Sequence, residues 1–293
     1  MIDRLGYYGR YAWDTLVLRR CPPLVFGVGI TDRCNLACAG CRVANTGLGD
    51  LSWERLEAMM VDASERGFRD LYFTGGEPML WRDGERGIDA AVRLAHDLGF
   101  FHVHVYTNGT LGLDCGADLV WTSIDGLPDA YKTRRGDHFD EVERAVRAKG
   151  HPPVAVIYVV DRRTVEGIEP FLRWVRDSRL PVLGVMFYFH TPYYGFDELY
   201  LNAEERAPIV DRLLQGVREG LPILNSRAGL LAFKSGVWPR RLPMAVVADA
   251  SGESVCCRAP DAACPDCGYT ACVEMAEARR LRPSAVLAMA RYW

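Results

Sequence analysis

The chain has 293 residues, 49% of them hydrophobic and 25% charged, which fits one large α/β domain or a domain with a small appendage and excludes a disordered chain. The formal net charge is −3 and no basic stretch stands out, so no nucleic-acid partner is expected. No apolar run approaches the roughly 18 residues of a membrane span, and the N-terminus lacks the apolar core of a signal peptide. We therefore expect a cytoplasmic protein without a transmembrane segment.

We predict a helical segment over the first 23 residues. Residues 2–20 carry Leu5, Tyr8, Trp13 and Leu16 in an amphipathic pattern. The pattern predicts a helix that packs against the rest of the protein, and association with a membrane surface is the alternative.

Between residues 24 and 220 short β-like runs alternate with longer helical patterns, which is typical of βα units and a parallel sheet. The predicted strands are residues 24–30, 70–74, 102–107, 119–124, 153–160 and 182–190. The predicted helices are residues 53–66, 87–98, 139–148, 165–177 and 203–219. The connection over residues 109–117 is too short and glycine-rich for a full helix. Six such units predict an α/β fold, a partial (β/α)6 TIM-type barrel.

The active site of such a barrel lies at the carboxyl ends of the strands. Polar residues follow the predicted strands at just these places. They are residues 31–41, residues 75–78, Asn108, Asp125, residues 161–163 and His190.

Three cysteines, Cys34, Cys38 and Cys41, come directly after the first predicted strand. They offer three thiolates within eight residues and no fourth. Closed zinc sites and closed iron–sulfur clusters use four protein ligands, so three ligands leave one metal coordination position open. The spacing therefore indicates chemistry at an exposed iron.

The cysteine motif, together with Thr74-Gly75-Gly76-Glu77-Pro78 after the second strand, resembles the radical S-adenosylmethionine (radical SAM) superfamily over roughly residues 24–220. The resemblance implies an oxygen-sensitive enzyme in which the three thiolates hold a [4Fe–4S] cluster. The open iron would bind the amino and carboxylate groups of S-adenosylmethionine, and reduction would release a 5'-deoxyadenosyl radical. An electron donor such as flavodoxin or ferredoxin is expected as a partner.

The same resemblance assigns cofactor-binding roles to residues at the ends of successive strands. The turn Gly75, Gly76, Glu77 and Pro78 would bind the methionine ammonium, with Glu77 stabilising the turn. Asn108, Ser123 and Asp125 would lie near the carboxylate and ribose of S-adenosylmethionine.

One position departs from the family pattern. Family loops commonly carry an aromatic residue just before the third cysteine, where this chain has Gly40. Adenine stacking must then come from elsewhere or be replaced by backbone contacts. The amino-acid sequence of the loop also resembles, more weakly, the hopanoid-biosynthesis branch of the family, which adds the adenosyl radical to an alkene.

A second cysteine cluster follows a predicted hairpin formed by residues 244–247 and 254–256. The candidate ligands are Cys256, Cys257, Cys264, Cys267 and Cys272. Within the resemblance such a C-terminal extension, here residues 221–293, binds an auxiliary [4Fe–4S] cluster. A zinc site and unliganded thiols are the alternatives. The sequence leaves open which four cysteines bind, and Cys264, Cys267 and Cys272 are preferred.

The substrate pocket is predicted from the residues at and after the last two strands of the barrel. The candidates are Phe187, Tyr188, His190, Tyr193, Tyr194, Arg162 and Arg163. His190 is the candidate proton donor or substrate contact. For the arginines, a phosphate or carboxylate contact and a solvated helix start both stay open.

The preferred substrate is a small molecule of nucleoside, sugar or isoprenoid type in a specialised biosynthetic pathway. The radical would abstract hydrogen from it or add to an unsaturated carbon. A maturase that modifies a ribosomal peptide is the second hypothesis. A non-catalytic zinc or iron–sulfur protein is the third, although such a protein has no need for the glycine-rich turn.

Overall fold

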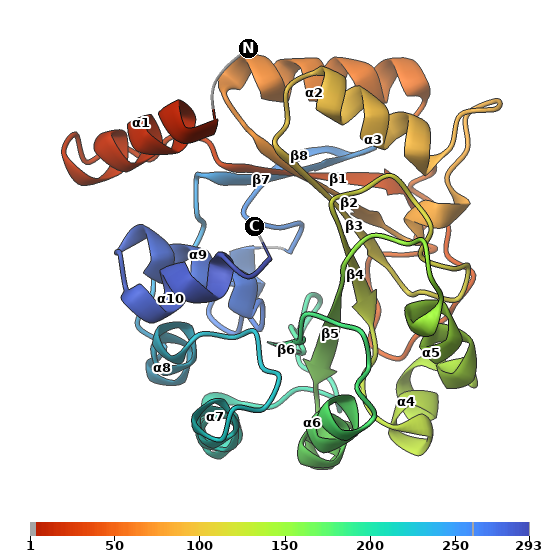
Figure 1. Cartoon of the computed structure of the whole chain (residues 1–293), viewed down its shortest axis with the longest axis vertical. Coiled ribbons are helices and arrows are strands. Elements are labelled where there is room, and N and C mark those ends of the chain that lie inside the picture. Colours follow the sequence, from red (N-terminus) through yellow and green to blue (C-terminus); the bar gives the residue numbers. More distant parts are fainter. Residues whose placement is uncertain (1–3, 260, 293) are drawn as a thin grey trace.

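The computed structural model describes residues 4–259 and 261–292. Within these residues eight strands form one curved, open sheet in the order β6-β5-β4-β3-β2-β1-β7-β8 (Figure 1). The six predicted strands are present and parallel: β1 (Val25–Thr31), β2 (Asp70–Gly75), β3 (His102–Thr107), β4 (Leu119–Ser123), β5 (Val154–Val160) and β6 (Val185–Phe189). The predicted α/β partial barrel is confirmed.

Helices cover the outer face of this sheet (Figure 1). The five predicted helices are α2 (Trp53–Arg66), α3 (Ile88–Asp97), α5 (Phe139–Arg147), α6 (Ile168–Asp177) and α7 (Ala203–Arg218). Helix α2 shows why they form and where they dock. Ser52 caps its N-terminus, Gly67 ends it in the left-handed conformation with φ +99°, and Leu56, Met60 and Ala63 bury one face.

The sequence analysis missed one helix of the barrel, α4 (Pro128–Arg135). It begins with proline in its first turn, where the missing N–H costs nothing. Only Tyr131 and Arg134 are buried in it, so it carries no apolar repeat of helical period. Its last two residues, Arg134 and Arg135, are paired with buried carboxylates, and hydrophobic periodicity does not detect such contacts.

The predicted hairpin is confirmed as β7 (Ala245–Asp249) and β8 (Gly252–Val255), but its position was not foreseen. Strand β7 pairs in parallel with β1, with Val25 opposite Ala245, so the C-terminal segment extends the barrel sheet itself.

Helices α8 (Arg227–Ser235), α9 (Thr270–Arg279) and α10 (Pro283–Met289) lie between β6 and β7, where the sheet does not close (Figure 1). The Phe187 carbonyl accepts a hydrogen bond from Thr270 Oγ1 at 2.6 Å, and the Phe189 N–H donates to the Gly268 carbonyl at 2.8 Å. Asn225 Oδ1 accepts from the Phe187 N–H at 2.8 Å. These bonds satisfy the outer edge of β6, which would otherwise be an unpaired strand edge.

Helix α1 (Arg4–Leu16) confirms the predicted N-terminal helix, although residues 2 and 3 lie outside the described residues. It packs on the body through Tyr7, whose hydroxyl donates to the Gly67 carbonyl at 3.2 Å, and Tyr8, whose hydroxyl donates to Asp70 Oδ1 at 3.1 Å. Trp13 on its other side is 59% exposed. None of the helices that the structure describes is long and apolar enough to cross a membrane.

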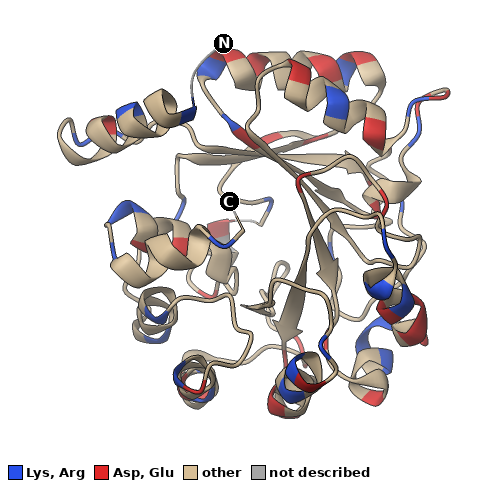
Figure 2. Ribbon diagram, in the orientation of Figure 1, with Lys and Arg blue, Asp and Glu red and all other residues tan. Residues whose placement is uncertain are grey.

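The strands alternate between two separate apolar clusters. The larger cluster lies between the sheet and its outer helices and includes Phe187 and Phe189. The smaller one lies inside the barrel and is formed by Leu119, Trp121, Ala155, Ile157, Met186 and Leu224. Charged side chains gather on the outer helices, whereas the strands are largely free of them (Figure 2).

Candidate active site

The turn after β2 is pressed against the start of the cysteine loop. Gly76 N–H donates to the Thr31 carbonyl at 2.7 Å, and Glu77 N–H donates to the Arg33 carbonyl at 2.8 Å. A Cβ atom on Gly75 would lie 2.1 Å from the Thr31 oxygen, and one on Gly76 would lie 2.1 Å from the Arg33 oxygen. Glycine is therefore required at both positions, because a side chain would force the turn away from the loop.

The cysteine loop is folded back on itself by polar side chains. Asp32 accepts hydrogen bonds from Thr46 Oγ1, Gly47 N–H and Leu48 N–H at 2.9, 2.7 and 3.0 Å. Burial opposes ionisation of Asp32, but these bonds hold its pKa below its ordinary value. Asn45 Oδ1 accepts from the Cys34 N–H at 2.9 Å. The loop conformation is thus fixed by its own residues.

The three predicted cluster ligands and the glycine turn border one cavity of about 380 Å³. Cys34, Cys38 and Cys41 line it together with Gly75 and Gly76. The structure therefore brings together the two motifs that lie 34 to 42 residues apart in the sequence. In the described part of the chain, no group of three His, Cys, Asp or Glu side chains is arranged to bind a single metal ion.

Two of these thiols receive hydrogen-bond donors, which suits a thiolate that ligates iron. Asn108 Nδ2 lies 3.7 Å from Cys34 Sγ, and Arg135 Nη1 lies 3.8 Å from Cys38 Sγ. Burial raises the pKa of both thiols, and the Arg135 charge opposes that rise at Cys38. The donor set of soft sulfur atoms with cationic and amide support fits an iron–sulfur cluster.

Asp125 is fully buried and its carboxylate acts as a hub for two arginines of α4. Its Oδ2 lies 2.6 Å from Arg135 Nε and 3.0 Å from Arg134 Nε, and its Oδ1 accepts from the Val159 N–H at 2.7 Å. Arg134 is also paired with buried Asp161. Asp125 is thus engaged by protein groups and orients Arg135 toward Cys38.

Glu77 is fully buried under the glycine turn. Its carboxylate accepts hydrogen bonds from Met79 N–H at 3.0 Å, Thr107 Oγ1 at 2.7 Å and Asn108 N–H at 2.7 Å. Burial raises its pKa, against the effect of these donors. Glu77 joins the ends of β2 and β3. Pro78, also buried, begins a short 3₁₀ turn that Glu77 caps.

His190 lies beside the cysteine loop, at the carboxyl end of β6. A Cβ atom on Gly40 would lie 3.0 Å from His190 Cε1 and 2.6 Å from Leu199 Cδ1, so glycine at 40 leaves room for the imidazole. His190 Nε2 is paired with Asp197 Oδ2 at 2.9 Å. Burial lowers the pKa of His190, and Asp197 opposes this effect. His190 and Ser123 both line the cavity.

Three of the C-terminal cysteines border the same cavity. Cys256, Cys257 and Cys272 line it, and the Sγ atoms of Cys256 and Cys272 are 3.4 Å apart. Cys267 is buried and its Sγ accepts from the Tyr269 N–H at 3.4 Å, whereas Cys264 is half-buried. Which four of the five cysteines bind a cluster stays a prediction.

Several predicted pocket residues lie elsewhere. Phe187 is buried in the outer cluster because it alternates with inward-facing Met186 and Tyr188. Tyr194 is 75% exposed. Arg162 and Arg163 are exposed and paired with Glu205 and Glu198, as expected for a solvated helix start. Tyr188, His190 and Tyr193 do line the cavity.

Comparison with known proteins agrees with this geometry. The family model of the radical SAM superfamily matches residues 28–175, which contain both the cysteine motif and the glycine turn. The chain belongs to the radical SAM superfamily. It is an enzyme of that superfamily, whose members use a [4Fe–4S] cluster and S-adenosylmethionine.

Individual relatives support the same family. The chain is 30% identical over 168 residues to a probable GTP 3',8-cyclase of Methanopyrus kandleri, covering 51% of this chain and 52% of the relative. It is 31% identical over 155 residues to the GTP 3',8-cyclase of Corynebacterium glutamicum, covering 49% and 38%. The chain thus spans about half the length of the first relative and a smaller share of the second.

Solved structures share the radical SAM fold. Native anSMEcpe with bound AdoMet superposes with a TM-score of 0.62 at 21% identity, covering 80% of this chain and 73% of that one. Streptococcus suis SuiB bound to S-adenosylmethionine superposes with a TM-score of 0.64 at 13% identity, covering 88% and 67%. At these identities the likeness concerns the fold.

The predicted pocket did not include five aromatic residues that line the radical SAM barrel: Tyr72, Tyr106, Trp121, Tyr269 and Tyr292. A usable signal was present in the strands. Tyr72 and Tyr106 interrupt apolar strands two residues before Thr74 and Asn108, on the same face as those strand-end residues. Sequence reasoning also missed Arg134 and Arg135, because α4 was not predicted.

Proposed function

We propose that this radical SAM enzyme cleaves S-adenosylmethionine reductively and directs the resulting radical at a small molecule held inside the barrel. The observation that carries the proposal is one continuous cavity, which begins at Cys34, Cys38, Cys41 and the glycine turn and continues between the strands. When bound, the [4Fe–4S] cluster supplies the electron that breaks the sulfonium bond. The three cysteines would hold it.

The residues around the cavity would bind S-adenosylmethionine, position its neighbours and contact the substrate. The turn of Gly75 and Gly76 offers close backbone approach to the methionine end of S-adenosylmethionine, while Glu77 and Pro78 fix that turn. Asn108 and Ser123 lie on the neighbouring strand ends, within reach of the same ligand, and Asp125 acts through Arg135. His190 would contact substrate or donate a proton, since its ring lies beside the cysteine loop.

The proposal includes an auxiliary [4Fe–4S] cluster in the segment 221–293. Its support is the approach of Cys256, Cys257, Cys267 and Cys272, which come from the loop after β8 and from α9. Cys264 lies in the same loop region and completes the set of five candidates. An external electron donor, such as a flavodoxin or ferredoxin, would reduce the first cluster.

The substrate class is proposed from the cavity. A cavity of about 380 Å³ inside the barrel favours a small molecule, of nucleoside, sugar or isoprenoid type, over a folded polypeptide. A ribosomal peptide is the second candidate. A precursor peptide that stimulates cleavage of S-adenosylmethionine, when none of the small molecules does, would replace the first candidate by the second.

The deciding experiment is anaerobic reconstitution with iron and sulfide, followed by mass spectrometry of products from labelled S-adenosylmethionine. 5'-Deoxyadenosine released in excess of the amount formed without substrate indicates hydrogen abstraction, and label in a larger product indicates adenosyl addition. Cys34→Ala should abolish cleavage. Cys267→Ala should retain cleavage yet impair turnover, and full turnover by that variant would remove the auxiliary site from the mechanism. Stoichiometric zinc at both sites and no cleavage under strong reductant would refute the enzyme proposal.

A further inference from the structure

The barrel interior below the cysteine loop is lined by aromatic rings that contact one another in sequence. Tyr72 contacts Tyr106 with ring centroids 5.2 Å apart, and Tyr106 stacks on Trp121 at 5.8 Å with 17° between their planes. Trp121 meets the edge of Tyr292 at 5.3 Å. A second pair is formed by Tyr188 and Tyr269, whose ring centroids lie 5.6 Å apart. These rings form an aromatic wall around the cavity.

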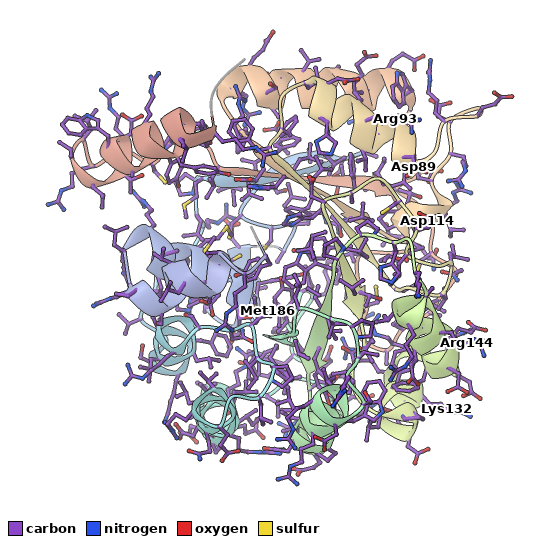
Figure 3. All side chains as sticks on the ribbon, in the orientation of Figure 1. Asp89, Arg93, Asp114, Lys132, Arg144 and Met186 are labelled. Atoms are coloured by element: carbon purple, nitrogen blue, oxygen red, sulfur yellow. The ribbon has the colours of Figure 1, made fainter. Side chains whose placement is uncertain are left out.

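Apolar side chains fill the gaps between the rings. Ile157, Val159 and Met186 come from β5 and β6, and Met275 and Met289 come from the C-terminal helices. Figure 3 shows Met186 toward the centre of the molecule, whereas Asp89, Arg93, Lys132 and Arg144 lie on the outer layer. Methionine adapts its shape to flat or irregular apolar ligands.

Two of the polar groups that line the barrel interior, His104 and Tyr106, carry no charge. Burial lowers the pKa of His104 to about 3, so its imidazole is neutral, and its Nδ1 accepts from Trp121 Nε1 at 3.3 Å. Burial likewise raises the pKa of Tyr106, so this phenol stays protonated. Such groups offer hydrogen bonds to hydroxyl or carbonyl oxygens but no counter-ion.

The cations at the cavity are already engaged. Arg134 and Arg135 are paired with Asp125 and Asp161, and Arg258 lies 3.7 Å from Asp249. Among the described lining residues the remaining cation, Arg42, is exposed and follows Cys41 in the loop. A phosphate or triphosphate group binds where several unpaired Lys or Arg side chains converge. The barrel interior has no such convergence in the part of the chain that the structure describes.

Resting on the proposed function, we infer that the substrate is an uncharged organic molecule with a flat aromatic or unsaturated face and at most a few hydroxyl or carbonyl groups. It would lie along the aromatic wall, in contact with Tyr106, Trp121 and Tyr188, which all line the cavity. A nucleoside triphosphate, the substrate named by the GTP 3',8-cyclase relatives, does not suit this lining.

The inference is tested with two probes that share one ring system, 2-naphthol and 2-naphthyl phosphate, and with GTP. Binding to the reconstituted holoenzyme, loaded with S-adenosylmethionine and without reductant, is measured by isothermal titration calorimetry. We expect 2-naphthol to bind at least about tenfold more tightly than its phosphate, a gap of about 1.4 kcal/mol. Equal or tighter binding of the phosphate or of GTP, or failure of 2-naphthol to bind, overturns the inference.

Two variants locate the binding site. Trp121→Ala should weaken 2-naphthol binding about tenfold or more, because it removes one ring of the aromatic wall and the contacts that position Tyr106 and Tyr292. Trp13→Ala, on the exposed face of α1, is the matched control and should leave binding unchanged. An unchanged affinity in a folded Trp121→Ala protein places the probe elsewhere and overturns the inference. If that variant does not fold, the relative affinities of the parent enzyme for the three probes decide whether the inference stands.

The outcome is kept separate from the proposed function by a second measurement on the same preparations. Release of 5'-deoxyadenosine from S-adenosylmethionine under strong reductant requires no substrate. If it fails, the proposed function is wrong whatever the probe order. If it succeeds while the phosphate or GTP binds more tightly, only the substrate class is wrong.

Discussion

Asp125→Asn perturbs the buried charge hub beside the first cysteine loop. The asparagine amide retains one oxygen for the Val159 N–H but removes the negative charge that faces Arg134 and Arg135. Arg134 keeps Asp161 as a partner, whereas Arg135 loses the carboxylate 2.6 Å from its Nε. The variant therefore leaves a buried guanidinium without the carboxylate that orients it toward Cys38.

Breaking a buried ion pair by removing one partner costs about 3–5 kcal/mol, and the retained Asp161 contact places this case near the lower end. For a chain of this length we expect the melting temperature to fall on the order of 5–10 °C. Urea denaturation under anaerobic, reducing conditions measures the free energy of unfolding. Asp129→Asn, an exposed position on the same helix, is the control and should change stability by less than about 0.5 kcal/mol.

The reasoning is refuted if Asp125→Asn is as stable as Asp129→Asn. A functional readout accompanies the stability measurement, because Arg135 Nη1 lies 3.8 Å from Cys38 Sγ. We expect slower cleavage of S-adenosylmethionine by the folded fraction of Asp125→Asn and unchanged cleavage by the control.

Two further predictions concern a buried carboxyl and the glycine turn. Burial raises the pKa of Glu274 from 4.5 to about 7, so the folded protein keeps a proton that the unfolded chain loses between these values. The free energy of unfolding should therefore fall by about 3 kcal/mol as the pH rises from 4.5 through 7. Glu274→Gln should flatten that dependence in urea titrations at pH 5 and pH 8, and an undiminished fall in the variant would contradict the assignment. Gly76→Ala should weaken S-adenosylmethionine binding at least about tenfold, because the new Cβ would lie 2.1 Å from the Arg33 carbonyl oxygen. Gly116→Ala, with its nearest neighbour at 3.7 Å, should bind normally, and equal affinities would show that the turn tolerates displacement.

Residues close together in the chain explain most of what could be predicted. The cysteine spacing, the two glycines before Glu77 and the alternation of strands and helices are local patterns, and each predicts its structure from a few neighbouring residues. The capped, amphipathic helix α2 is such a case. Predictions failed where long-range charge contacts replaced hydrophobic periodicity, as in α4.

The sequence by itself determined the parallel βα architecture and the cofactor family, because both follow from short motifs whose geometry is set within the backbone. Only the tertiary structure decided which face of each strand lines the cavity. Side chains alternate between the two faces of a strand, but this alternation does not tell which face points into the barrel. The tertiary structure also placed β7 beside β1 and Tyr292 against Trp121. Those contacts join segments about 170 or more residues apart in the chain, and their energies depend on the shape of the assembled barrel.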